Sequence, residues 1–149
     1  MPTLVVLLFS VLLLSPAVAA PPAQQTVTTA KPFWTLAEDL KKAIAGQGML
    51  LVTQACASCG AKARGIDIPG NLVFGVFRND YAVRMLDADI GAGIEAPVRF
   101  YLTERPDGTA ALSWKTPTSI FAPYGNAGLD AMAAELDGIF EAIAADAVK

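Results

Sequence analysis

Residues 71–109 read NLVFGVFRNDYAVRMLDADIGAGIEAPVRFYLTERPDGT, a stretch in which signals for a strand, a helix, a second strand and a hairpin follow one another. The first seven residues are apolar at nearly every position, which favours a strand that is covered on both sides within a sheet. Asn79 or Asp80 is suited to cap the helix that follows. Tyr81, Met85 and Leu86 recur at helical spacing behind that cap.

The second half of the stretch predicts a hairpin. In VRFYLTE, residues 98–104, apolar and polar side chains alternate, so that Arg99 and Tyr101 share one face of a strand. The RPDG turn then leads into TAALSWK, residues 109–115. Arg99, Tyr101 and Trp114 are candidates to line a pocket on the sheet, although strand residues of these types more often pack together or face water.

Further elements are predicted on both sides of this stretch. Thr35-Leu36-Ala37-Glu38 has the pattern of a capping box at the start of a helix, and MLLVTQA, residues 49–55, has that of a strand. A long closing helix is indicated by an apolar stripe made of Leu129, Met132, Ala133, Leu136, Ile139, Phe140 and Ile143. The expected fold class is α+β, with a small sheet of about four to five strands, largely antiparallel, and helices packed on one face.

The N-terminus has the pattern of a secretory leader. An apolar run at residues 4–14 is followed by Pro16 and by the small-x-small site at residues 17–19, which predicts cleavage after Ala19. A run of about 11 residues is too short to cross about 30 Å of hydrocarbon. The sequence therefore predicts a periplasmic or secreted protein with no membrane segment after cleavage.

The mature chain is predicted to form one domain. Residues 20–32 have few large apolar side chains and are expected to be a flexible lead-in, with at most an edge strand at Gln25–Thr29. Residues 33–149 are expected to form the single folded domain. The 11 basic and 14 acidic side chains give a net charge of −3 without a basic stripe, so nucleic acid is not an expected partner.

The segment from Leu72 to Thr109 resembles the domain of unknown function 302 family. Members of that family pair a strand that ends in Gly-hydrophobic-hydrophobic with a helix, and then place a Pro-led strand before an acidic DG hairpin. Here Gly75, Pro97 and Gly108 occupy the matching positions. The resemblance extends upstream to a helix with the pattern L..AI...G, formed by Leu40, Ala43, Ile44 and Gly48.

This resemblance implies a small α+β domain and supplies no agreed reaction. Where many members have Asn-Pro after the first strand, this chain has Arg78-Asn79, so any role of the Asn-Pro pair is not carried over. Arg78 and Asn79 nevertheless lie at a strand-to-helix junction, where they are candidate ligand-binding residues together with Arg99 and Tyr101. The alternative is that they form a helix cap and a solvated arginine.

Cys56 and Cys59 form a CxxC motif, CASC. A c-type haem site needs histidine directly after the second cysteine, and this chain has no histidine at all. The absence of histidine also excludes Ser-His-Asp and Cys-His catalysis and every histidine metal site. No metal site and no cofactor is therefore assigned, and no set of residues indicates an enzyme.

Three interpretations of the cysteine pair stay open. In an exported protein the two thiols are expected to form a disulfide, and its short loop contributes only about 2 kcal/mol of stability. The second interpretation is a redox couple, because a helix start near Ser58 and the cations Lys62 and Arg64 favour a thiolate. The third is monovalent copper held by two thiolates.

The leading functional hypothesis is an exported binding or accessory module. Its ligand is an unidentified small molecule or protein partner, and it is a candidate homodimer. The alternative from another class is a periplasmic thiol-disulfide oxidoreductase that uses Cys56 and Cys59.

Overall fold

The computed structural model describes residues 23–149, so the predicted leader lies outside the described residues. It contains a five-stranded antiparallel sheet with the strand order β1-β5-β4-β3-β2. The elements, in chain order, are β1 (Gln24–Pro32), α1 (Phe33–Gly46), β2 (Leu50–Cys56), α2 (Ala57–Ala63), β3 (Asn71–Phe77), α3 (Asn79–Ala88), η1 (Ile90–Glu95), β4 (Val98–Glu104), β5 (Thr109–Lys115), α4 (Pro117–Phe121), η2 (Ala122–Tyr124) and α5 (Ala127–Val148).

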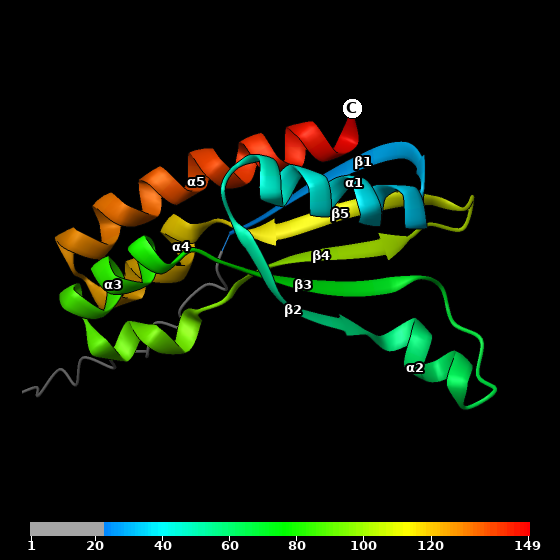
Figure 1. The fold of residues 1–149 in the computed structure, drawn as a ribbon, viewed down its shortest axis with the longest axis horizontal. Helices are drawn as coiled ribbons and strands as arrows, with labels where there is room; N and C mark the ends of the chain where they lie inside the picture. Colours follow the sequence, from blue (N-terminus) through cyan, green and yellow to red (C-terminus); the bar gives the residue numbers. More distant parts are fainter. Residues whose placement is uncertain (1–22) are drawn as a thin grey trace, which may run out of the picture.

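The two long helices cover one face of the sheet, and the predicted α+β class is confirmed. Figure 1 shows α1 and α5 side by side along β1, β5 and β4. Alternate residues of the central strands, such as Phe74, Phe100 and Leu112, point into this layer and are fully buried. The ring of Phe140 in α5 stacks on Phe100 with the centroids 4.7 Å apart. The apolar stripe of α5 is therefore the helical half of the core.

No long helix from the described part of the chain covers the opposite face of the sheet. Several of its strand residues, including Val73, Arg99 and Tyr101, are half-buried or exposed. At one end of this open face lie η1, α4 and η2, three short helical segments that the sequence analysis did not predict. These segments border the open face and turn one end of it into a groove.

The flexible lead-in predicted for residues 20–32 is wrong over most of its length. Gln24–Pro32 forms β1, which pairs with β5 from Gln24 opposite Lys115 onward. The predicted edge strand at Gln25–Thr29 is thus confirmed and is longer than expected. A strand poor in large apolar residues is stable here because β5 supplies its hydrogen-bond partners, and this partner is distant in the sequence.

The two predicted helix caps are also wrong. Helix α1 begins at Phe33, two residues before Thr35. Its N-capping residue is Pro32, which makes no side-chain capping bond. Helix α3 begins at Asn79 after Arg78, again without a side-chain cap, and Leu86 is 42% exposed rather than buried. Helix α1 follows β1 directly and α3 follows β3 after one residue, so both helices begin close to a strand end without a capping side chain.

No helix among residues 23–149 combines the length and the apolar character that crossing a membrane requires.

Candidate functional site

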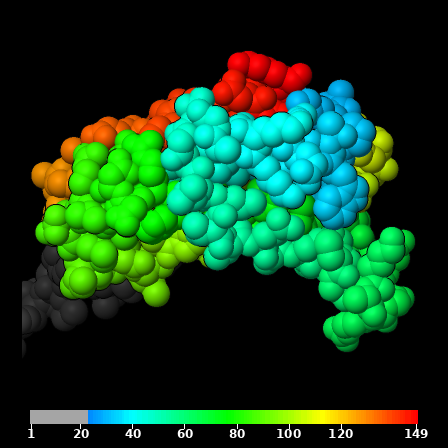
Figure 2. All heavy atoms as spheres, in the orientation of Figure 1, coloured from blue at the N-terminus to red at the C-terminus, as the bar shows by residue number. Residues whose placement is uncertain are grey.

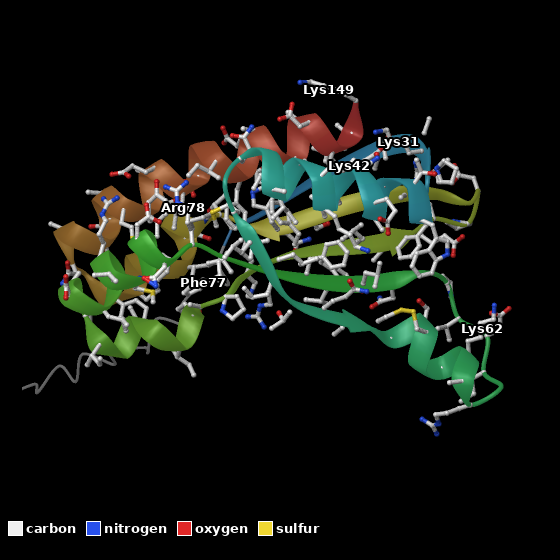
Figure 3. All side chains as sticks on the ribbon, in the orientation of Figure 1. Lys31, Lys42, Lys62, Phe77, Arg78 and Lys149 are labelled. Carbon is white, nitrogen blue, oxygen red and sulfur yellow. A yellow bond between two sulfur atoms is a disulfide. The ribbon has the colours of Figure 1, made fainter. Side chains whose placement is uncertain are left out.

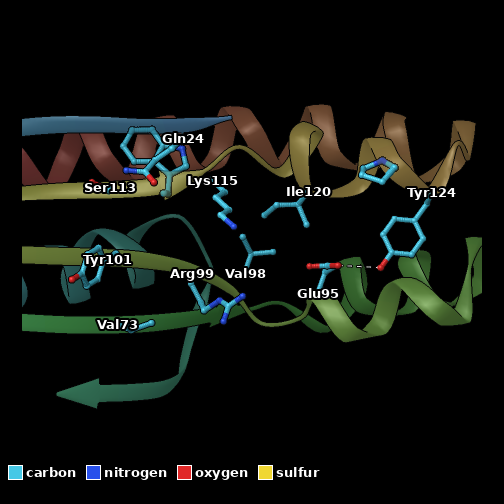
Figure 4. A pocket seen from close by; sticks show the side chains of 12 residues that line it. Gln24, Val73, Glu95, Val98, Arg99, Tyr101, Ser113, Lys115, Ile120 and Tyr124 are labelled. Atoms are coloured by element: carbon cyan, nitrogen blue, oxygen red, sulfur yellow. Dashed lines mark hydrogen bonds between the residues drawn. The ribbon is translucent and has the colours of Figure 1, made fainter. Parts of the chain in front are cut away.

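The open face of the sheet holds a groove of about 600 Å³. Its floor is formed by the adjacent strands β3, β4 and β5, and its end wall by η1 and the segment from α4 to η2 (Figure 4). The lining residues are Gln24, Val73, Glu95, Val98, Arg99, Tyr101, Ser113, Trp114, Lys115, Ile120, Pro123 and Tyr124. A groove of this size is within the range of small-molecule sites, which hold roughly 300–1,000 Å³.

The floor of the groove follows from strand register. Tyr101 of β4 is opposite Ser113 of β5 and opposite Val73 of β3, so the three side chains point to the same face. Arg99, two residues before Tyr101, is opposite Gly75 and points to that face as well. Alternation along two neighbouring strands therefore brings a cation, a phenol and a hydroxyl together on one surface.

Gly75, which is opposite Arg99, is closely packed between Thr53 and Pro97. A Cβ atom at this position would overlap the Oγ1 atom of Thr53 and would lie 2.8 Å from Cγ of Pro97. Since such contacts are closer than van der Waals packing allows, only glycine fits between β2 and the start of β4. The glycine that the sequence analysis matched to the family pattern thus has a steric role next to the groove.

Two cations reach into the groove. Figure 4 shows the side chains of Arg99 and Lys115 extending toward the space in front of Val98 and Glu95. None of the six ion pairs among residues 23–149 involves Arg99 or Lys115. These two positive charges are therefore free to meet an anion from solution.

Glu95, the carboxylate that lines the groove, forms a hydrogen bond with Tyr124 in the end wall. Oε1 of Glu95 accepts a hydrogen bond of 3.1 Å from the hydroxyl of Tyr124. Burial, together with this hydrogen bond, raises the pKa of Tyr124 above its ordinary value. The phenol consequently stays protonated and holds Glu95 against the end wall.

Polar contacts fix the rest of the floor. The hydroxyl of Tyr101 accepts a short hydrogen bond from Nδ2 of Asn71. The hydroxyls of Ser113 and Thr26 lie 2.9 Å apart and share a hydrogen bond across β5 and β1. These contacts hold the side chains of Tyr101 and Ser113 on the floor of the groove.

The structure brings only two of the four predicted ligand-binding residues together. Arg99 and Tyr101 line the groove, whereas Arg78 and Asn79 are not among its lining residues. Nε of Arg78 donates to Oδ1 of Asp80 at 2.8 Å, and its guanidinium lies 4.3 Å from the ring centroid of Tyr81. Asp80 raises the pKa of Arg78, so this arginine is already occupied in a structural cluster.

Sequence reasoning missed several residues of the groove. The sequence could have indicated Ser113 and Lys115, because the RPDG hairpin places Ser113 opposite Tyr101, and Lys115 lies two residues further along the same strand. Other lining residues, such as Gln24 and Tyr124, come from elements with no sequence signal that links them to β4.

The cysteine pair lies at the end of the sheet where β2 runs into α2. The structure joins Cys56 and Cys59 by a disulfide. Cys56 is the N-terminal capping residue of α2, and its Sγ atom accepts a hydrogen bond of 3.0 Å from the amide of Cys59. Helix α2 contains no buried residue, and Cys59 is exposed. Among residues 23–149 no group of three or more metal-binding side chains comes together.

Residues 25–147 match the family described as Domain of unknown function DUF302. The chain belongs to the DUF302 family. A solved structure described as an uncharacterized conserved DUF302 protein from Bacillus stearothermophilus has a similar fold, with a TM-score of 0.72 at 19% sequence identity. The match covers 85% of this chain and 98% of that one. A search of the curated proteins finds no match. The DUF302 fold is thus shown, and the function has to be argued from the residues of this chain.

Proposed function

We propose that this DUF302 chain is an exported binding module that holds a small organic anion in the groove on the open face of its sheet. The observation that carries the proposal is the pair of cations, Arg99 and Lys115, which reach into a groove of about 600 Å³ and make no ion pair among the described residues.

The walls of the groove suit a ligand that also has an apolar part. Val73, Val98 and Ile120 contribute aliphatic surface, and Tyr101 contributes an aromatic ring. An anion beside such walls is held more tightly than in water, because the apolar surface lowers the local dielectric constant. A carboxylate attached to a ring or a short aliphatic chain is therefore the class of ligand that fits best.

The test is a thermal-shift and calorimetric titration with benzoate, and with benzamide as its neutral analogue. Benzoate should bind and benzamide should not. Arg99→Gln and Lys115→Gln should each weaken benzoate binding by about 10- to 100-fold, since a hydrogen bond to a charged group contributes about 1.5–3 kcal/mol. Arg105→Gln, which removes an exposed arginine outside the groove, is the matched control. Equal binding of benzoate and benzamide, or unchanged binding in both groove variants, would refute the proposal.

Export is the second part of the proposal, and it rests on the apolar run at residues 4–14 and on the small residues before the cleavage site. Protein recovered from the periplasm or the medium should begin at Ala20. An intact mass that retains Met1 in such protein would contradict the assignment.

Thiol-disulfide exchange is a second candidate function, favoured by the exposure of the bridge. Because Cys59 is exposed and Cys56 is half-buried, an incoming thiolate can attack Sγ of Cys59. The Cys56–Cys59 bond then breaks, a mixed disulfide forms on Cys59, and Cys56 leaves as a thiolate. The amide of Cys59 already donates to Sγ of Cys56 and would stabilise that thiolate.

The reduction potential decides between this candidate and a structural bridge. A working couple should have a potential between about −120 and −270 mV, whereas a structural disulfide should lie below about −300 mV. Insulin-reductase activity that Cys56→Ser abolishes would support the redox function. A potential below the structural limit would exclude it.

A further inference from the structure

The strand β2 presents an open edge of the sheet. Among residues 23–149 it pairs with β3 alone, since it is the last strand in the order β1-β5-β4-β3-β2. Its seven residues, LLVTQAC, include no charged residue and no proline, and Leu50 and Val52 are 59% and 48% exposed. The other edge strand, β1, carries Lys31 and Pro32, which are residue types that protect an edge from pairing. Only a bulge between Leu51 and Thr53 interrupts the edge of β2.

Two projections flank this edge. We define the α2 arm as residues 57–69, which follow the Cys56 end of β2, and the η1 knob as residues 86–95. The knob lies at the Leu50 end, because Leu50 is opposite Phe77, which leads into α3, and η1 leads into β4 beside that same end of β3. Figure 2 shows the surface hollowed between the arm and the opposite end of the molecule.

The exposed apolar side chains gather on these three segments. Of the ten large apolar residues that are exposed among residues 23–149, seven lie on β2, the α2 arm or the η1 knob. They are Leu50, Val52, Ile66, Ile68, Leu86, Ile90 and Ile94. Ile90 and Ile94 are 80% and 82% exposed, which is unusual for isoleucine. Most of the exposed large apolar residues therefore lie on these three segments, and the other three are Trp34, Val83 and Tyr101.

The two projections carry opposite charge. The α2 arm contains Lys62 and Arg64 against one carboxylate, Asp67. The η1 knob contains Asp87, Asp89 and Glu95 and no basic residue. Because Glu95 lines the groove and accepts a hydrogen bond from Tyr124, Asp87 and Asp89 are the carboxylates that face a partner. The arm and the knob lie at opposite ends of β2. A twofold axis that runs between the two copies, beside the middle of each β2 strand, therefore places each arm against the knob of the other copy.

We propose that the β2 edge, the α2 arm and the η1 knob form a self-complementary interface for a second copy of this chain. The two β2 strands lie antiparallel across the twofold axis, so that the two sheets become one sheet of ten strands. Each arm contacts the partner's knob through isoleucines, and Lys62 and Arg64 meet the knob carboxylates. Such an isologous contact closes on itself, and the product is a dimer rather than a filament.

The first test measures the dimer directly by sedimentation velocity and light scattering on the purified protein. Figure 3 shows Lys62 on the α2 arm, away from the sheet. The wild-type chain should be a dimer, and Val52→Lys should raise the dissociation constant at least about tenfold by placing a charge in the edge. Thr28→Lys, on the exposed part of the β1 edge, is the matched control and should leave the dimer unchanged. A monomeric wild type, or an equal effect of the two lysine substitutions, would overturn the proposal.

The second test uses charge reversal. Lys62→Glu with Arg64→Glu makes the arm acidic, and Asp87→Lys with Asp89→Asn makes the knob less acidic and adds a lysine. The arm variant should dissociate, because its acidic arm faces an acidic knob. An equimolar mixture of the arm and knob variants should form heterodimers, since the reversed arm then meets the altered knob. Circular dichroism checks that each variant is folded, and a mixture of folded variants without heterodimers would refute the arm-to-knob contact.

Discussion

Shortening Leu136 to alanine tests how α5 packs on the sheet. Leu136 lies in the middle of α5 and is 5% exposed. The substitution removes three carbon atoms, which at about 0.8 kcal/mol per methylene group is a loss of about 2.4 kcal/mol. Leu136 also lines a cavity of about 40 Å³ between α3, α5 and the sheet. If neighbouring side chains relax only in part, the cavity grows by roughly 50 Å³, and this adds about 1 kcal/mol. We therefore expect the free energy of unfolding to fall by about 3 kcal/mol.

Urea unfolding of the oxidised protein, followed by tryptophan fluorescence and circular dichroism, measures this change. Leu136→Met keeps most of the volume and should cost less than about 1.5 kcal/mol. Glu141→Ala, on the exposed side of α5, should stay within about 0.5 kcal/mol of wild type. The slope of the free energy of unfolding against urea concentration should be the same in all variants. A loss of less than about 1 kcal/mol for Leu136→Ala would mean that this part of α5 does not pack as described.

Three further predictions concern charge, sterics and the disulfide. Hydrogen bonds from Arg84 lower the pKa of Glu135 in the folded protein, so the stability from this pair is present above the unfolded pKa and is lost as the pH falls through the folded value. Glu135→Gln should therefore flatten the loss of stability between about pH 5 and 3 in acid titrations monitored by circular dichroism, and an unchanged acid limb would contradict this. Gly75→Ala should cost about 1–3 kcal/mol in urea unfolding because its Cβ overlaps Thr53, and adding Thr53→Ala should recover part of the loss. Reduction of the Cys56–Cys59 bridge should cost at most about 2 kcal/mol because the closed loop is so short, and a larger loss would show that the bridge holds more than α2.

Local patterns in the sequence were sufficient for the central part of the fold. The alternation of residues 98–104 correctly placed Arg99 and Tyr101 on the face opposite to the core, and the RPDG turn correctly predicted the hairpin. The stripe on α5 was found for the same reason, since a helix or strand that is buried on one face repeats its apolar residues with its own period. The family resemblance found in these residues is confirmed by the match of residues 25–147 to the DUF302 family.

Tertiary pairing decided what local patterns did not contain. Residues 24–32 have the composition of a flexible segment, yet they form β1 because β5, more than 75 positions later in the chain, offers an edge. The groove likewise needs Glu95 and Tyr124, which meet at 3.1 Å only after η1 and η2 fold against the end of the sheet. The sequence alone therefore determined the periodic elements, the CxxC motif and one row of the groove. The pairing of β1 with β5 and the end wall of the groove depend on contacts between residues that are distant in the chain. Such contacts produce no periodic pattern and no motif in the sequence.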